Sequence, residues 1–321
     1  MAASVRKYAK KSATIAIAKP ASVASPALPA GVPDAWQRAG MRAVVLESRR
    51  RRRLPPRVAV AMLLVACPDP AVVAGFLKQQ RQTRQIVAWR RVMARHGTGC
   101  GIIAKLLENR AVEPLRDDLA SVIELFDRAA AIDPVAAMAL HSLGDAGELE
   151  RGSVEVMRWL KQRRLLGKNR RLLDLGCGIG RMLPVLAPHC ARVDGVEPVA
   201  ALARHARKHC RDLANVEIHR TDGRDLAKFP DGSCDIILAI DSFPYLVAAH
   251  LADLHVAESA RVLAPGGDLV IINWSYDHDA ATDRAVVRDL AERHGFRVLR
   301  CGGRPFTTWD GELFHLRKRR R

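Results

Sequence analysis

The sequence predicts an α/β protein built on a doubly wound, mostly parallel sheet of seven strands, preceded by a helical N-terminal extension. Three observations predict this fold. The chain has 321 residues, 49% of them hydrophobic, which is enough for one large or two ordinary globular domains. Strand and helix patterns alternate from residue 171 onward. A glycine-rich turn at 176–180 joins the first of these strands to the next helix pattern.

The alternating segments follow one another in order. Seven short apolar runs have strand patterns, at 171–175, 192–196, 216–220, 234–240, 268–273, 296–300 and 312–317. Helix patterns lie between most of them, at 182–189, 200–210, 251–263 and 285–294. Strands connected through helices pair in parallel. The last two strands leave no room for a crossover helix, so we expect them to pair antiparallel.

The chain divides into four parts. Residues 1–57 form a basic, low-complexity arm that we expect to be disordered, because its composition offers little to bury. Residues 58–149 form a helical region that serves as a lid, in which His141 and Ser142 are candidates to reach over a pocket. Residues 150–317 form the α/β domain, and a helix near its start has Ser153 as a plausible N-cap. Residues 318–321 form a basic tail.

Positive charge is concentrated at the front of the chain. The net charge is +18, with 52 Lys and Arg against 34 Asp and Glu, and residues 1–110 hold 21 of the bases but 4 of the acids. A basic arm on a near-neutral domain indicates an anionic partner such as nucleic acid. An organellar transit peptide has a similar composition. Arginine far outnumbers lysine (41 against 11), which favours a GC-rich bacterial genome.

An apolar run at 58–66 precedes Cys67 and, read from Met41, resembles a lipoprotein signal. Its nine residues are too short to span a bilayer, and we interpret it as a buried helix or strand segment. The chain has seven cysteines, an odd number, without a Cys-x-x-Cys pair. This pattern argues against a disulfide scaffold or a zinc ribbon and favours a reducing, cytoplasmic location. No metal site is predicted.

The strongest motif is Asp174-Leu-Gly176-Cys177-Gly178-Ile-Gly180, a buried strand that enters a glycine-rich turn. Glycine tolerates positive φ and lets the backbone approach a ligand closely. The N-terminus of the following helix favours anionic or polar ligand groups. The dinucleotide fingerprint requires a third glycine at the position of Arg181, which argues against NAD as the ligand. Binding of another nucleotide is still compatible with this spacing.

The run 172–180 resembles the first motif of class I S-adenosylmethionine (SAM)-dependent methyltransferases. Four further segments agree with the family in order, at 193–198, 221–223, 231–241 and 261–270. The resemblance covers about 150–317. It implies the Rossmann-like methyltransferase fold, SAM as cofactor, and methyl transfer to an O, N, S or C nucleophile.

The resemblance also implies cofactor-binding residues in the first motif. Backbone amides around Gly176, Cys177, Gly178 and Gly180 are expected to hold the methionyl end of SAM, with Asp174 facing its ammonium group. A structural role for Asp174, as a cap on a neighbouring helix, stays open. For the Cys177 side chain we favour packing over a role as a catalytic thiol.

The next motifs imply the binding site of the adenosine. Glu197, at the end of the second strand, is expected to accept hydrogen bonds from the ribose hydroxyls. Asp222 is expected to accept from the adenine amino group, with the Gly223 backbone beside the ring and Pro198 against its face. Glu197 as a solvated strand end and Asp222 as an ordinary turn residue are the alternatives.

Candidate catalytic residues follow the fourth and fifth strands. Asp241 is a candidate to contact the cofactor and to orient or deprotonate the nucleophile, and Tyr245 to wall the pocket. Their segment differs from the Asn/Asp-Pro-Pro-Tyr motif of amino-methylating enzymes, which argues against nucleobase or amide N-methylation. His278 is a candidate base. Capping by Asp241, packing by Tyr245 and a solvated loop at His278 are the structural alternatives.

Three functions fit these observations. The first is a cytoplasmic SAM-dependent methyltransferase acting on a small molecule. The second is an RNA or DNA methyltransferase that uses the basic N-terminal arm for phosphate contacts. The third is a non-catalytic binding protein with the SAM fold. Three carboxylates at the expected strand ends favour the first two over the third.

Overall fold

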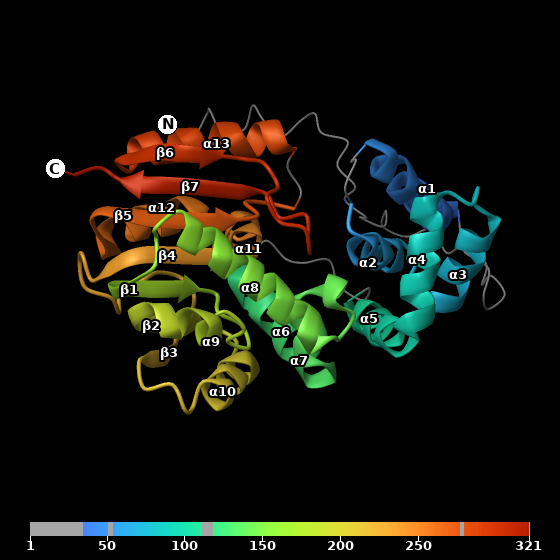
Figure 1. Ribbon diagram of the computed structural model, residues 1–321, viewed down its shortest axis with the longest axis horizontal. Coiled ribbons are helices and arrows are strands. Elements are labelled where there is room, and N and C mark those ends of the chain that lie inside the picture. Colours follow the sequence, from blue (N-terminus) through green and yellow to red (C-terminus); the bar gives the residue numbers. More distant parts are fainter. Residues whose placement is uncertain (1–34, 51–53, 111–117, 277–278, 321) are drawn as a thin grey trace.

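The computed structural model describes residues 35–50, 54–110, 118–276 and 279–320. Its centre is a sheet of seven strands in the order β3-β2-β1-β4-β5-β7-β6 (Figure 1). The strands are β1 (Gly167–Leu175), β2 (Cys190–Glu197), β3 (Val216–Arg220), β4 (Cys234–Ile240), β5 (Leu263–Ile272), β6 (Phe296–Cys301) and β7 (Leu313–Lys318). Strand β7 runs antiparallel to both β5 and β6, and the other pairs are parallel. The predicted fold, including its antiparallel end, is confirmed.

Helices cover both faces of the sheet, which is why its central strands are apolar along their length. In β4, every residue except Asp235 is buried. The helices between the strands are α9 (Leu183–Leu186), the short 3-10 helix η3 (Ala187–His189), α10 (Ala200–His209), α11 (Phe243–Ala248), α12 (Ala252–Val262) and α13 (Ala280–Arg293).

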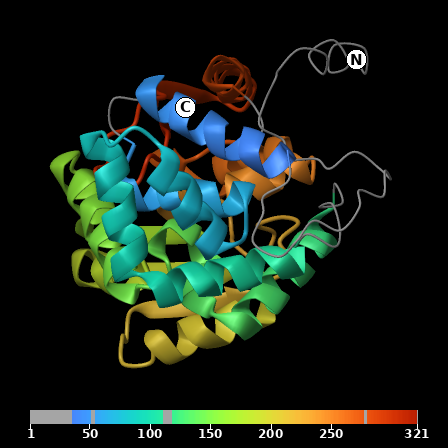
Figure 2. The same cartoon turned by 90° about the vertical axis from the view of Figure 1, so that its right-hand side faces the viewer.

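The N-terminal extension is helical; its part up to residue 110 lies at the right of Figure 1, and its later part lies near the centre of the picture, next to the sheet. Its elements are α1 (Ala35–Arg50), α2 (Pro56–Ala66), α3 (Pro70–Gln79), α4 (Arg84–Arg95), α5 (Gly97–Arg110), α6 (Leu119–Ile132), α7 (Pro134–Met138), η2 (Leu140–Ser142) and α8 (Ala146–Gln162). Helices α1 to α5 pack around the fully buried Trp89, and their buried side chains belong to one continuous core with those on a face of the sheet. Figure 2 views this helical unit face on.

The predicted disorder of the arm is wrong for residues 35–50. These residues form α1, because Met41, Val44 and Val45 recur at helical spacing and are buried against the other helices. Residues 1–34 of the predicted arm lie outside the described residues. The apolar run at 58–66 is a buried helix, α2, and Cys67 after it is 1% exposed. The buried-segment interpretation is thus confirmed.

Two local predictions at the domain boundary need correction. Ser153 does not cap a helix, because α8 begins at Ala146 with Asp145 as its N-cap, and the Ser153 hydroxyl donates to Leu149 O inside the helix. Lys318, predicted to begin a tail, is the last residue of β7 and donates to Leu263 O. Among the described residues no single helix is long and apolar enough to cross a membrane, although α2 and α3, bent by 114° at their junction, meet that criterion together.

Candidate active site

A cavity of ≈ 130 Å³ lies at the carboxyl ends of β1, β2 and β4, under helices α6 and α7. This volume holds roughly ten ordered waters or part of an organic ligand. In open α/β sheets, ligands bind at this edge of the sheet. Apolar side chains from the two helices form the roof: Leu119, Val122, Ile123, Phe126 and Met138. Within the predicted lid region 58–149, α6 and α7 supply the described residues that cover the cavity, and a lid function for the region stays a prediction.

The glycine-rich turn forms part of the cavity floor through Gly176 and Gly178. Both have positive φ, 77° and 58°, which glycine adopts without strain. A Cβ on Gly178 would stand 2.2 Å from the sulfur of Met138, so the lid packs directly on the backbone of the turn.

The amides of this turn are already engaged within the protein. Gly176 N and Cys177 N both donate to Val196 O, and Gly180 N donates to Cys177 O. Gly178 N donates to the Glu197 carboxylate at 2.8 Å. The expected use of these amides as ligand donors therefore disagrees with the structure. Instead of donating to a ligand, the turn lets a ligand approach its backbone closely and holds the Glu197 carboxylate in place.

Glu197 ends β2 as a buried carboxylate in the cavity wall, 4% exposed. Its oxygens accept from Gly178 N and Val199 N, each at 2.8 Å. Burial raises the pKa of Glu197 to about 7, against the opposing effect of these two hydrogen bonds. The carboxylate is therefore held in place but poorly solvated, as suits a group that receives ligand hydroxyl or cationic donors.

Asp174 lies beneath the turn, 2% exposed, and has no hydrogen-bond partner among the described residues. Burial raises its pKa to about 7, and Arg181 opposes this rise. The alternative role as a helix cap is not observed. Of these two carboxyl groups, Glu197 lines the cavity, whereas Asp174 is buried outside its lining, so Glu197 is the one that a positively charged ligand group would meet directly.

Asp241 and Asn273 form a polar pair at the ends of β4 and β5. Both have left-handed backbones, with φ of 56° and 64°. Asn273 Nδ2 donates to Asp241 Oδ1 at 2.6 Å, and the Tyr276 hydroxyl donates to the same oxygen at 3.1 Å. Burial raises the pKa of Asp241, although Asn273 and Arg181 stabilise its ionised form. Strained, non-glycine residues of this kind cluster at functional sites.

Aromatic rings close the cavity beside Asp241. The rings of Phe126 and Tyr245 meet edge to face at 5.0 Å, and those of Tyr245 and Tyr276 at 5.9 Å. They come from three elements: the lid helix α6, α11 and the loop after β5. Next to them, the Ser242 hydroxyl is buried in the wall without a hydrogen-bond partner among the described residues. A ligand in this part of the cavity would contact aromatic rings and a small polar patch formed by Ser242 and Asp241.

Several predicted site residues take other positions. Asp222 is exposed and accepts from Arg224 N in a local turn, while Asp225 lines the cavity in its place. Gly180 lies away from the cavity, where a Cβ would stand 3.2 Å from Ala206 of α10. Pro198 and Gly223 line the cavity as expected, as do Asp241 and Tyr245. His278 lies outside the described residues.

Cys177 packs beneath the turn rather than facing the cavity. A Cβ on Gly195 would stand 2.8 Å from its sulfur, so the thiol fills the space above β2. Burial raises the pKa of Cys177 well above that of a free thiol. A thiolate nucleophile at this position is therefore disfavoured, in agreement with the packing interpretation.

Arg181 joins the turn to the helical extension. Its Nη1 donates to Ser153 Oγ of α8 at 3.2 Å, and its guanidinium lies 4.9 Å from the centroid of the Trp309 ring. His141 packs edge to face on the same ring at 5.7 Å, rather than lining the cavity as the lid hypothesis expected. Arg181 is thus the positive charge that accompanies Asp174 and Asp241.

The aromatic residues of 273–279 were expected to line the acceptor site, and Tyr276 does so, whereas sequence reasoning missed Asn273 and did not identify the individual lid side chains. Asn273 carried a usable signal, because a polar residue directly after an apolar strand lies at the ligand-binding edge. The lid residues carried none, since their apolar spacing is that of any amphipathic helix.

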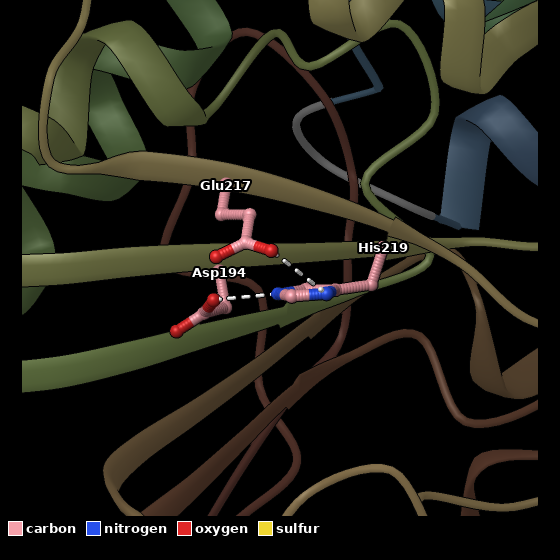
Figure 3. Close-up of side chains that lie close together, drawn as sticks. All are labelled: Asp194, Glu217 and His219. Carbon is pink, nitrogen blue, oxygen red and sulfur yellow. Dashed lines mark hydrogen bonds and ion pairs between the residues drawn. The ribbon is translucent and has the colours of Figure 1, made fainter.

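One cluster outside the cavity has the composition of a metal site. Asp194, Glu217 and His219 lie side by side on β2 and β3, with His219 Nε2 2.7 Å from Asp194 Oδ1 (Figure 3). Arg192 already neutralises the two carboxylates, with Nε 2.8 Å from Asp194 Oδ2 and Nη2 2.6 Å from Glu217 Oε2. We therefore interpret the cluster as an ion-pair network that joins two strands.

Comparison with known proteins adds a family match. Residues 173–271 match the family model described as a methyltransferase domain. The chain is 33% identical over 105 residues to a demethylmenaquinone methyltransferase of Tropheryma whipplei, covering 33% of this chain and 42% of that protein. It is 30% identical over 125 residues to a phosphatidylethanolamine N-methyltransferase of Cereibacter sphaeroides, covering 38% and 58%. The chain thus spans less than two thirds of each.

A third relative is a SAM-dependent Diels-Alderase, iccD, of Talaromyces variabilis, 29% identical over 140 residues, covering 42% of this chain and 46% of that protein. Among solved structures, magnesium protoporphyrin IX methyltransferase from Synechocystis with bound SAM has a TM-score of 0.48 at 17% identity, covering 64% of this chain and 98% of its own. The [4+2]-cyclase SpnF also has a TM-score of 0.48, at 18% identity, covering 65% and 98%.

Proposed function

Since the chain carries a class I SAM-dependent methyltransferase domain, we propose that it transfers the methyl group of SAM to a nucleophile on an uncharged, mainly apolar small molecule. The relative named for demethylmenaquinone supports a small acceptor of this type. Seven free cysteines, six of them buried, support a cytoplasmic location.

The residues around the cavity fit SAM. Glu197 suits the ribose hydroxyls, since a carboxylate accepts two hydrogen bonds and this one lies in the cavity wall. Pro198, Val199 and Gly223 offer apolar contact to the adenine. Asp174, buried outside the cavity lining, would act on the methionyl ammonium through its negative charge. The buried carboxylate of Glu197 in the cavity wall is the observation that supports the proposal best, because a ligand that donates to it replaces the solvation that burial removes.

The acceptor class follows from the charge and polarity of the cavity. Among the residues that the structure describes, no lysine or arginine lines it, whereas Glu197, Asp225 and Asp241 do. An anionic acceptor would be repelled by these carboxylates. The remaining walls are aromatic and aliphatic, so they favour an apolar acceptor with one polar group near Asp241.

When bound, SAM supplies an electrophilic methyl group on a sulfonium. The protein's own task is to position the nucleophile in line with that methyl group, for which roughly 7–11 kcal/mol of barrier reduction is available. Asp241 would accept the proton of a hydroxyl or amine nucleophile at Oδ1 or Oδ2, and its raised pKa favours this role. Asn273 would hold the carboxylate in orientation. Tyr245, Tyr276 and Phe126 would exclude water.

The test uses the full chain. Binding of S-adenosylhomocysteine is measured by calorimetry, followed by transfer of labelled methyl from SAM to the organic and aqueous fractions of a cell extract. We expect binding, loss of binding in Glu197→Ala, and label in the organic fraction. Absence of binding by the wild-type chain would refute the proposal, and label only in the aqueous fraction would refute the acceptor class.

Two alternatives are separated by the same assay. Label in added RNA or DNA would favour a nucleic-acid methyltransferase. Cofactor binding without label in any fraction would favour a protein that uses the fold for binding or for another reaction, as the name of the Diels-Alderase relative illustrates.

A further inference from the structure

The helical unit α1–α5 exposes arginines that have no counter-charge. On α1, Arg38, Arg42 and Arg49 are exposed and follow one another at spacings of four and seven residues, which places them on one face. None of the three pairs with an acid among the described residues, and residues 35–110 contain three acids, Glu47, Asp69 and Glu108.

A second stripe of arginines lies on α4. Arg84, Arg91 and Arg95 are exposed at spacings of seven and four residues, and no ion pair involves them among the described residues. The two helices adjoin, since Ser48 near the end of α1 contacts Gln85 at the start of α4 at 3.4 Å. We call these six arginines the cationic surface.

Two apolar side chains stand out of the same helix, α1. Trp36 is 66% exposed and Leu46 is 56% exposed, although the opposite side of α1 is buried in the unit's core. Leu46 lies four residues after Arg42, within the arginine stripe. An exposed leucine inside a cationic stripe has no favourable contact with water or with a phosphate backbone, but it gains free energy in the headgroup region of a bilayer.

We propose that the cationic surface docks this protein on an anionic lipid bilayer, with Trp36 and Leu46 entering the interface. Charge complementarity selects the partner, because arginines near an anionic leaflet attract it additively. Charge and apolar side chains together provide the two signals that stable peripheral binding requires. This proposal gives a role to the excess positive charge of the helical unit, which the proposed methyl transfer does not use.

The position of the helical unit agrees with this inference. Helix α5 packs against the lid helices α6 and α7, and α2 packs against η2. Figure 2 shows α1 and α5 on the outward side of the molecule, in front of the sheet. Docking would therefore bring the lid and its apolar cavity near the bilayer, where an apolar acceptor is concentrated. That last step rests on the proposed function, whereas bilayer binding itself does not.

The test measures sedimentation of the full chain with vesicles of phosphatidylcholine, with or without phosphatidylglycerol. We expect binding to the anionic vesicles alone, weakened by salt. Arg38→Gln/Arg42→Gln should weaken it by about thirty-fold, at the usual contribution of an arginine near such a surface. The matched control, Arg204→Gln/Lys208→Gln on exposed positions of α10, removes the same charge and should leave binding unchanged.

Tryptophan fluorescence gives an independent readout. The chain has five tryptophans, and Trp89, Trp159, Trp274 and Trp309 are 0%, 6%, 1% and 4% exposed. Quenching by brominated lipids on vesicle binding should therefore come from Trp36 and be lost in Trp36→Phe.

Three results would overturn the proposal: no binding to anionic vesicles at low salt, equal weakening by the control pair, or tight binding of an RNA oligonucleotide that anionic vesicles do not compete. Vesicle binding by a chain that fails to bind S-adenosylhomocysteine would refute the proposed function while leaving this inference intact.

Discussion

Cofactor binding should release protons, because two buried carboxyl groups at or near the proposed cofactor site have raised pKa values. Burial raises the pKa of Asp174 and of Glu197 to about 7 each. At pH 7 each is therefore about half protonated. Hydroxyl and ammonium donors of the cofactor stabilise the ionised forms, so binding should release about one proton in total.

The same linkage fixes how affinity depends on pH. Below pH 7 the ligand must compete with protons at both carboxyls, so affinity should fall as the solution becomes more acidic. With two groups at about 7, the affinity for S-adenosylhomocysteine should fall roughly thirty-fold from pH 7 to pH 6.

Calorimetry in buffers of different ionisation enthalpy measures the released protons directly. Glu197→Gln should reduce the release to about half, whereas Asp212→Asn, at an exposed position on the surface, should leave it unchanged. No proton release at pH 7, or an affinity that is flat between pH 6 and pH 8, would refute the assignment of these carboxyls to the cofactor.

The apo protein should show the opposite trend in stability. An acid whose pKa is higher in the folded than in the unfolded state favours folding at low pH, and that contribution is lost as pH rises from the unfolded to the folded value. For Glu197 this window runs from 4.5 to about 7, equivalent to at most about 3 kcal/mol. The cofactor-free wild-type protein should therefore lose stability as the pH rises from 4.5 to about 7, measured by urea unfolding across this range.

Further predictions concern the turn, the polar pair and the thiols. Gly178→Ala combines a φ of 58° with a Cβ 2.2 Å from the Met138 sulfur, and should lower the free energy of unfolding by about 1–3 kcal/mol; adding Met138→Ala should restore the part due to the collision. Asn273→Ala should move the acidic limb of the pH–rate profile upward, since Asp241 loses a donor that stabilises its ionised form, while cofactor affinity stays constant. Of the seven cysteines, the half-buried Cys301 should react with a thiol reagent in the folded protein and the rest after unfolding.

The sheet was predictable because its signals are local. Each strand is a short apolar run, and a parallel strand that is buried on both faces can be recognised in the sequence as a continuous run of apolar residues. The first and last residues of a strand were harder to predict where the strand contains residues that are typical of turns. The fifth strand was predicted at 268–273, yet β5 is Leu263–Ile272, since Leu263 pairs with Cys234 ahead of the Pro-Gly-Gly segment.

The site was predictable where it depends on a strand end and hidden where it depends on tertiary contact. Glu197 and Asp241 follow buried strands, so their places at the edge of the sheet could be inferred. Asp222 failed because the turn after β3 directs it to solvent and brings Asp225, three residues later, to the cavity. Asn273 was missed because its role depends on Glu312, whose backbone N–H donates to Asn273 Oδ1 from across the sheet.

The lid connects the two halves of the molecule physically. Leu119 stands 3.1 Å from where a Cβ on Gly223 would be, and Met138 packs on Gly178, so lid side chains contact the two glycines that border the proposed adenosine and methionyl sites. The same lid contributes Phe126 to the aromatic wall of the acceptor space. A ligand that displaces these side chains loses the free energy of their packing contacts. Cofactor binding, acceptor binding and lid movement are therefore expected to be coupled equilibria. Because α5 packs on this lid, we expect substitutions in the helical unit to change ligand affinity in the cavity, although none of the unit's described residues lines it.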